Sequence, residues 1–140
     1  MAKVNLHFEG IDPFSLDIGL INSWLHDCCL REGYELQALN IICCNDDFLL
    51  EINQAYLQHD YYTDIITFDL SESEKTIEGE LYISIDRINE NAQELSVSFE
   101  QELHRVIVHG TLHLLGYLDK TEQDQEIMRS KEDTYLSLLN

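Results

Sequence analysis

Apolar and polar residues first alternate along the chain and then recur at helical spacing. Every second position of residues 3–8 is apolar, which predicts a strand with one buried face. Asp12 and Pro13 are typical of a helix start and Gly33 of a helix end, so a helix is predicted over 14–31. Its apolar positions are Leu16, Leu20, Ile21, Trp24 and Leu25.

The remaining chain continues this succession of strands and helices. Further strands are predicted over 36–44, 63–70 and 79–85, and further helices over 86–95, 99–115 and 122–138. Another helix follows the second strand, capped by Asn45 or Asp46. The polar connection 72–78 is short, which makes the third and fourth strands antiparallel neighbours. The pattern predicts an α+β fold, in which about five helices cover a small mixed four-stranded sheet.

Composition supports one domain over residues 1–140 and restricts its partners. Hydrophobic residues make up 44% of the chain, and no repeat or linker marks a boundary. Lys and Arg number 8 against 27 Asp and Glu, a formal charge of -19 that disfavours unaided binding to DNA or RNA and adsorption to an anionic membrane. No leader pattern or membrane-length apolar run is present, so we expect a cytoplasmic protein.

Four cysteines occur as two adjacent pairs, Cys28 with Cys29 and Cys43 with Cys44. This spacing matches neither a zinc knuckle nor a disulfide framework. We interpret all four as small buried hydrophobes in a reducing compartment, in preference to a cysteine zinc site.

The candidate chemistry lies in the predicted helix 99–115 and the residues after it. His109 and His113 are four residues apart, so both imidazoles project from one helix face and can reach one metal ion. Gly116 can turn the chain back beyond the helix end, which lets Asp119 supply a third ligand. Three protein ligands leave one position of a tetrahedral zinc ion for water. The pattern therefore predicts one Zn²⁺, or another divalent transition metal, that catalyses hydrolysis through a metal-bound water.

A weaker interpretation treats His109 and His113 as partly buried helix residues satisfied by hydrogen bonds, and the glycine turn with Asp119 argues against it. His104 is off the face of His109 and is interpreted as structural. Gly110 occupies the position at which metalloproteases of the HExxH class carry their general base, which disfavours a peptidase. We expect its small size to leave space beside the metal for a substrate group.

Together these residues resemble the YbeY family of metal-dependent endoribonucleases, whose signature reads H-G-x-L-H-L-x-G-Y-D-H. The chain matches it at His109, Gly110, Leu112, His113, Leu114, Gly116 and Tyr117. Residues 63–68 (TDIITF) and 79–84 (GELYIS) are similar to two strands of the family. The resemblance implies a zinc-dependent hydrolase that cleaves single-stranded RNA in 16S rRNA 3′-end maturation and ribosome quality control, with ribosomal or ribosome-assembly proteins as partners.

Three positions depart from the family pattern. Asp119 replaces the third histidine of the signature, Leu118 replaces the preceding aspartate, and Leu57 replaces an arginine of the Y-R-x-K-D-x-P-T segment that the resemblance links to RNA cleavage. The loss of a guanidinium removes a donor that could bind a phosphate. The other candidates for phosphate contacts are His59, Arg105 and Lys120.

Two other functions remain open at this point. One is a ribosome-associated accessory protein whose metal only stiffens the region around Gly116. The other is a metal-dependent phosphoesterase acting on a different substrate. The acidic composition favours delivery of RNA on the ribosome, or by a partner, over direct capture by the chain.

Overall fold

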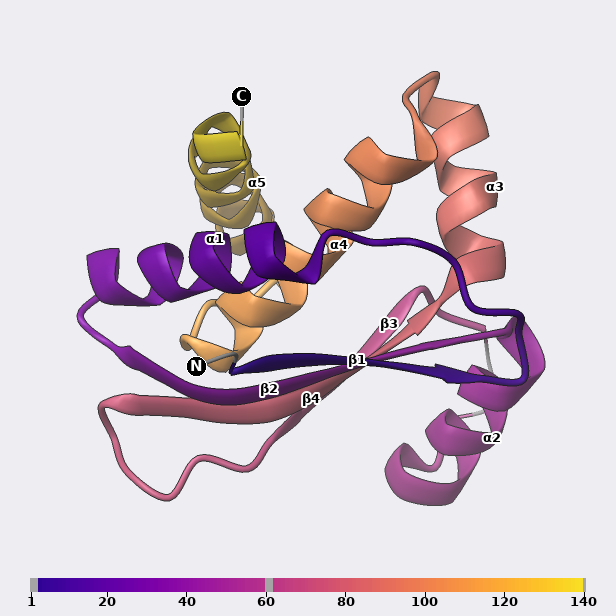
Figure 1. Cartoon of the computed structure of the whole chain (residues 1–140), viewed down its shortest axis with the longest axis horizontal. Helices are drawn as coiled ribbons and strands as arrows, with labels where there is room; N and C mark the ends of the chain where they lie inside the picture. The colour runs from indigo at the N-terminus through magenta and orange to yellow at the C-terminus, as the bar shows by residue number, and fades with distance from the viewer. Residues whose placement is uncertain (1–2, 60–61, 140) are drawn as a thin grey trace.

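The computed structural model describes residues 3–59 and 62–139, which form a four-stranded sheet and five α-helices (Figure 1). The strands are β1 (Val4–Glu9), β2 (Glu35–Cys44), β3 (Ile65–Asp69) and β4 (Thr76–Ser84). The helices are α1 (Ile18–Arg31), α2 (Asp46–Leu57), α3 (Ile85–Leu95), α4 (Phe99–Leu114) and α5 (Glu122–Leu136), followed by the 3-10 turn η1 (Ser137–Leu139). The predicted α+β fold is confirmed.

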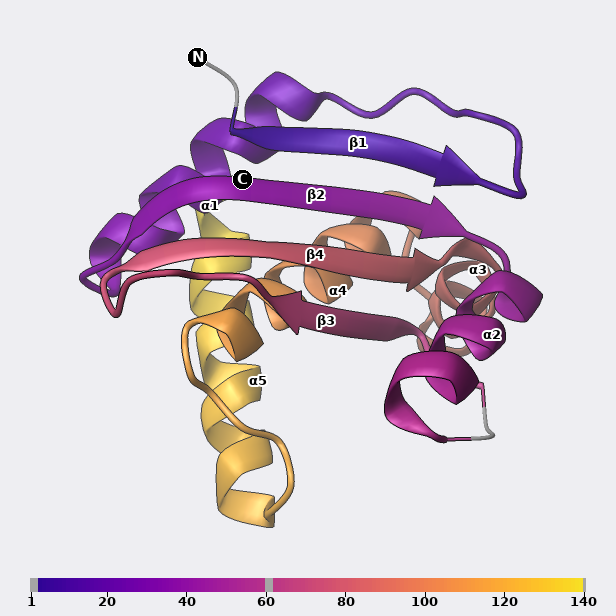
Figure 2. The same ribbon diagram turned by 90° about the horizontal axis from the view of Figure 1, so that it is seen from below.

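The sheet is mixed, with the strand order β1-β2-β4-β3 (Figure 2). β1 and β4 both run parallel to β2, and β3 is antiparallel to β4, as the short connection predicted. β4 begins at Thr76, three residues before the predicted start, because residues 76–78 pair with the first residues of β2. The connection 72–78 is therefore partly strand, which corrects the prediction.

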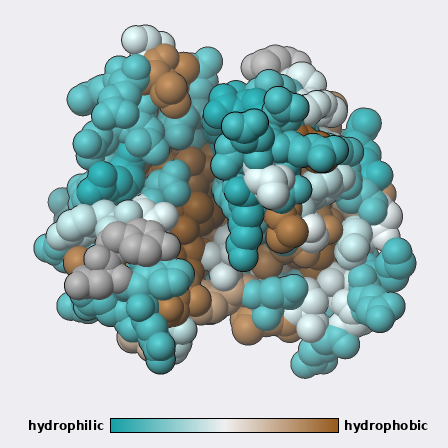
Figure 3. Space-filling view, turned by 180° about the vertical axis from the view of Figure 1, so that it is seen from behind, coloured by the Kyte–Doolittle hydropathy of each residue, from teal (hydrophilic) through white to brown (hydrophobic). Residues whose placement is uncertain are grey.

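The helices cover the two faces of the sheet unequally. α1, α3, α4 and α5 lie on one face, and α2 lies on the other near the end of β2 (Figures 1 and 2). The main core forms beneath the first group, where Leu81 of β4 and Ile107 of α4 are fully buried. A smaller cluster of Cys44, Leu49 and Ile66 forms beneath α2. On the face seen from behind, hydrophobic residues gather in a central recess between hydrophilic flanks (Figure 3).

α1 starts later than Asp12 and Pro13 predicted. The helix begins at Ile18, and Asp17 caps it by accepting a hydrogen bond from the Leu20 amide at 3.1 Å. Phe14 lies in the preceding connection and packs edge-on against Phe8 and Phe99, with ring centroids 5.0 and 5.6 Å apart. Leu20 was predicted to face the core, but it is 45% exposed. The buried face of α1 is therefore narrower than the spacing of its apolar residues predicted.

All four cysteines are free and buried, as predicted. Burial raises the pKa of each thiol from 9.0 to about 12. They therefore serve as packing residues and remain protonated at neutral pH.

Candidate metal centre

α4 holds the two predicted histidine ligands at the edge of its buried face. The helix starts with a capping box, in which the Ser98 hydroxyl accepts from the Gln101 amide at 3.1 Å and the Gln101 side chain accepts from the Ser98 amide at 2.9 Å. His109 and His113 keep about a quarter of their side chains exposed, 25% and 23%. The buried residues of α4 hold the helix against the core, and the helix backbone therefore sets the positions of both imidazoles.

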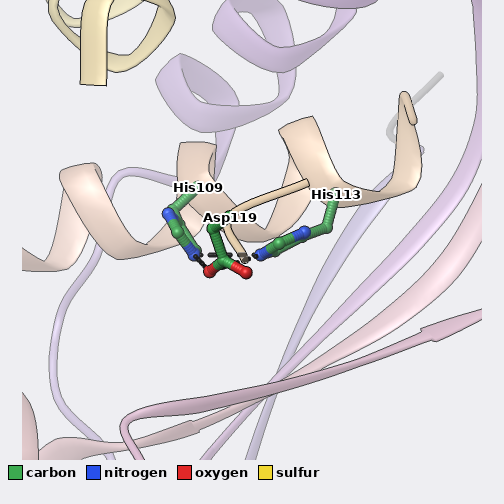
Figure 4. A group of neighbouring side chains, drawn as sticks. All are labelled: His109, His113 and Asp119. Carbon is green, nitrogen blue, oxygen red and sulfur yellow. Dashed lines mark hydrogen bonds and ion pairs between the residues drawn. The ribbon is translucent and has the colours of Figure 1, made fainter. Parts of the chain in front are cut away.

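Gly116 ends α4 in the way that its position predicted. Its backbone is left-handed, with φ at +103°, and the Gly116 amide donates to the His113 carbonyl at 3.0 Å. The Tyr117 amide donates to the Leu112 carbonyl, also at 3.0 Å. These two bonds form a Schellman motif, which closes the helix and reverses the chain. The reversal brings Asp119 back over the helix end, opposite the histidines (Figure 4).

The three ligand atoms converge on one point. His109 Nε2 and His113 Nε2 are 3.0 Å apart. Asp119 Oδ2 lies 3.4 Å from the first and 3.3 Å from the second. A tetrahedral ion with metal–ligand bonds of about 2.0–2.1 Å would separate its ligands by roughly 3.3 Å. The predicted cluster therefore exists and has the dimensions of a site for one small divalent ion.

The other ring nitrogen of each histidine is already engaged. His113 Nδ1 lies 2.9 Å from the Tyr117 carbonyl oxygen, which can only accept, so this nitrogen carries the proton. His109 Nδ1 lies 2.7 Å from Glu132 Oε2. Both rings therefore present Nε2 to the common point, and acceptors of this kind are typical partners of metal-binding histidines. The donor set fits a divalent transition metal.

Glu132 contacts the candidate centre, and the spacing of the histidines did not predict it. Its side chain, on α5, is only 6% exposed and bonds His109 as well as Arg105, whose guanidinium nitrogen lies 2.8 Å from Oε1. Burial alone would raise the pKa of Glu132, but these hydrogen bonds and charges outweigh it and lower the pKa below 4.5. One sequence signal existed, because Glu132 lies at helical spacing between the buried residues Met128 and Tyr135.

The Glu132 contact also affects the charge of His109. Burial would lower the pKa of this imidazole, but the hydrogen bond that it donates to Glu132 and the charges of Glu132, Asp119 and Asp64 raise the pKa above 6.5. Asp64 is half-buried and lines the cavity beside the site, and its desolvation raises the pKa of its carboxyl. The charges of Asp64, Asp119 and Glu132 all act on His109, and this negative charge favours a cation at the same point.

A cavity of about 440 Å³ opens beside the three ligands. His59 and Lys120, two of the three predicted phosphate contacts, line it, as does Leu57. Arg105 does not line it, because its guanidinium is held by Glu132 and by Asp133, the latter at 2.9 Å. The structure therefore places His59 and Lys120 at the site. Arg105 instead binds Glu132, which contacts His109.

Gly110 has a different role from the one expected. It is buried, and a β-carbon at this position would lie 2.6 Å from Ile65 Cδ1 and 2.9 Å from Leu81 Cδ2. Its small size therefore leaves no space for substrate and instead allows α4 to approach the sheet closely. The neighbouring His104 is buried with its ring edge-on to Trp24, which agrees with a structural role.

Comparison with known proteins agrees with this architecture. A profile of the family described as "Endoribonuclease YbeY" matches residues 17–140. The chain belongs to the YbeY family. A protein of that name from Cytophaga hutchinsonii is 52% identical over 118 residues, which cover 84% of this chain and 82% of that protein. Another from Porphyromonas gingivalis is 42% identical over 139 residues, 99% of this chain and 91% of that protein.

The fold also has a solved counterpart. The solution structure of a Thermotoga maritima protein superposes on this YbeY-family chain with a TM-score of 0.66 and 28% identity, covering 97% of this chain and 88% of the other. Among the described residues, no helix is long and apolar enough to cross a bilayer.

Proposed function

We propose that this YbeY-family protein is a metal-dependent endoribonuclease that cleaves single-stranded RNA. The observation that carries the proposal is the convergence of His109, His113 and Asp119 on one point, with ligand atoms 3.0–3.4 Å apart beside an open cavity. The family description and the names of the relatives supply the substrate class. We propose Zn²⁺ as the preferred ion, because two imidazoles and one carboxylate form a typical catalytic zinc donor set.

The residues around the centre have separable roles in this proposal. When bound, the ion supplies a Lewis acid that polarises a phosphoryl oxygen and makes water a better nucleophile at neutral pH. Glu132 and the Tyr117 carbonyl orient the two imidazoles. His59 and Lys120 line the cavity, where their donors can bind an RNA phosphate.

We further propose that the substrate is the 3′ end of 16S rRNA, met on the ribosome during small-subunit maturation and ribosome quality control. The formal charge of -19 supports delivery of RNA by an assembled partner, because an acidic chain repels free RNA. The same charge is complementary to basic ribosomal or assembly proteins. A cytoplasmic location follows from this assignment.

The decisive experiment pairs metal analysis with RNA cleavage. Purified wild type is expected to hold about one zinc per chain and to cut single-stranded RNA, alone or with ribosomes, whereas His113→Ala loses both. His7→Ala, which replaces an exposed histidine of β1, serves as the matched control and should retain both. A zinc-loaded wild type that leaves every RNA intact would exclude the nuclease.

A structural role for the metal is the second candidate, and Leu57 favours it. This leucine lines the cavity where the family pattern has an arginine, and no arginine is found among the described residues of the lining. An accessory protein would need the folded chain but no chemistry from the ion, which would only stiffen the region around Gly116. A folded His113→Ala variant that rescues cells depleted of the protein would support this alternative. Hydrolysis of small phosphoesters by wild type, and not by His113→Ala, would instead support a phosphoesterase on another substrate.

A further inference from the structure

Glu32 lies at the end of α1 and collects three hydrogen-bond donors from distant parts of the chain. The Tyr117 hydroxyl donates to Glu32 Oε1 at 2.6 Å, and the Lys131 ammonium lies 3.1 Å from Oε2. The Tyr135 hydroxyl also donates to Oε2. The Glu32 side chain is only 12% exposed. A carboxylate so enclosed and so fully bonded fixes the groups around it.

Of these donors, Tyr117 alone also belongs to the turn that builds the metal centre. Its carbonyl accepts from His113 Nδ1 at 2.9 Å, and its amide closes the Schellman motif on Leu112. Its ring packs against the main core, and Lys131 Nζ lies 5.6 Å from the ring centroid. The side chain of Tyr117 is thus held by α1 and α5 while its backbone holds a proposed ligand.

The rest of this turn has few inward contacts. Gly116, Leu118 and Lys120 are exposed, and Asp119 is otherwise held through its carbonyl, which accepts from Gln125 Nε2 at 3.1 Å. Tyr117 is therefore the inward anchor between the two ligands on either side of it. Without that anchor, ordering the turn would cost conformational entropy at the moment of metal binding.

We infer that Glu32 is a positioning residue of the metal centre, which acts through the Tyr117 hydroxyl to fix His113 and to place Asp119. This inference rests on the proposed metal site but not on the cleavage of RNA. In chemical terms, the Glu32 carboxylate preorganises the turn, so that His113 and Asp119 are held in place before the metal binds. Metal affinity should therefore depend on a hydroxyl that touches neither the ion nor either ligand side chain.

Two tyrosines provide a matched test, because both hydroxyls donate to the same carboxylate and only one belongs to the turn. Tyr117→Phe removes one bond to Glu32 and loosens the turn. Tyr135→Phe removes the other bond to Glu32 and loosens only the contact between α1 and α5. Both changes keep the ring and remove one hydroxyl, so any loss of fold stability should be similar in the two variants.

The measurement is the binding of Zn²⁺ in competition with a chromophoric chelator, together with the visible absorption spectrum of the Co²⁺ form and the melting temperature of the metal-free protein. Tyr117→Phe and Glu32→Gln are expected to weaken Zn²⁺ binding about ten-fold and to change the Co²⁺ spectrum, the size of effect typical of outer partners of metal ligands. Tyr135→Phe should lower the melting temperature while the affinity and the spectrum stay those of wild type.

The outcomes separate this inference from the proposed function. If wild type binds Zn²⁺ and both tyrosine variants bind it equally well, or are weakened equally, Glu32 has only a structural role and the inference is overturned. If wild type binds no Zn²⁺, the proposed metal centre itself is wrong. If metal binding follows the expected order and RNA remains uncut, the positioning role stands and the nuclease assignment falls.

Discussion

The two histidines of the candidate metal centre give their Nδ1 protons to different kinds of acceptor. His113 bonds the main-chain carbonyl of Tyr117, and His109 bonds the buried carboxylate of Glu132. A side-chain substitution can therefore remove the acceptor of His109 directly, whereas the acceptor of His113 can be moved only through the turn. Glu132 in turn is bonded by Arg105. This arginine flanks the histidine motif in sequence but does not line the cavity.

Replacing Glu132 is expected to weaken both metal binding and the fold. Glu132→Gln removes the charge that orients His109 and neutralises Arg105, so metal affinity should fall about 10- to 100-fold. The free energy of unfolding of the metal-free protein should fall by about 2 kcal/mol, because the buried carboxylate no longer accepts charge-assisted hydrogen bonds from Arg105 and His109. A chelator competition and a urea titration measure the two effects. Asp133→Asn is the control: it removes the other, 59% exposed partner of Arg105 and should cost under about 1 kcal/mol without changing metal affinity.

Leu57 allows a gain-of-function test in the cavity. A guanidinium introduced by Leu57→Arg would add donors for an RNA phosphate beside the proposed ligands, so single-stranded RNA cleavage should rise about ten-fold. Gln37→Arg adds the same charge on an exposed position of β2 that does not line the cavity. Initial cleavage rates at one salt concentration compare the two. Equal stimulation by both variants would show that overall charge, and not the cavity, controls the rate.

At the scale of elements, local patterns predicted α4 and its turn well because the determinants lie close together in sequence. Helical spacing joins His109 to His113, and Gly116 is followed within a few residues by Asp119. Distant partners left no such pattern, because Glu132 lies 23 residues from His109 and Glu32 lies 85 residues from Tyr117. These contacts depend on how α1 and α5 pack on α4, which no local spacing specifies.

Packing also explains the elements that sequence reasoning misplaced. Pro13 follows an aspartate, as at many helix starts, yet Phe14 is needed in the connection to pack against Phe8 and Phe99. The helix therefore begins only after the next capping residue, Asp17. The position of Gly110 between two proposed ligands suggested space for substrate, but its contacts with the sheet show that close packing requires a glycine here.

The turn after α4 should respond to backbone strain at Gly116. Nothing lies within 4 Å of a β-carbon built at this position, so Gly116→Ala adds no clash, but a backbone at φ +103° disfavours an L side chain. The expected cost is about 1 kcal/mol in unfolding free energy, with weaker metal binding because Asp119 is displaced. Gly116→Asn should cost less, since asparagine tolerates left-handed conformations better. Thermal melts and chelator competition measure both effects. A Gly116→Ala variant that is more stable and binds metal more tightly than Gly116→Asn would contradict this account.

At the scale of the whole molecule, elements from both ends of the chain meet around α4. α1 contributes Glu32 and Trp24, whose indole donates to the Tyr135 carbonyl of α5 at 2.8 Å. From α5, Glu132 bonds His109, a proposed metal ligand. The centre is therefore assembled by the tertiary fold and not by one motif. A chain with a formal charge of -19 must also fold against its own repulsion, so carboxylates with close hydrogen-bond donors or cationic partners help to stabilise the fold.

For Glu32, this contribution to the free energy of unfolding can be measured as a function of pH. Burial alone would raise the pKa of Glu32, but hydrogen bonds from Tyr117, Tyr135 and Lys131 outweigh it and lower the pKa below its ordinary value of 4.5. A carboxyl with a lowered native pKa stabilises the fold above its unfolded pKa, and that contribution is lost as the pH falls through the native value. In metal-free protein, Glu32→Gln should therefore reduce the free energy of unfolding by about 2 kcal/mol at neutral pH, a typical value for hydrogen bonds to a charged group.

The difference between wild type and Glu32→Gln should shrink once the pH falls below 4.5, because protonated Glu32 no longer offers a charge to its three donors. Urea titrations in chelator from neutral to acidic pH measure this difference directly. Glu35→Gln is the control, since the Glu35 side chain is 68% exposed and its ion-pair partner Lys3 is 3.9 Å away, so this variant should keep the pH dependence of wild type. A Glu32→Gln difference that stays constant down to acidic pH would mean that the hydroxyls and the ammonium bind the side chain equally well without its charge.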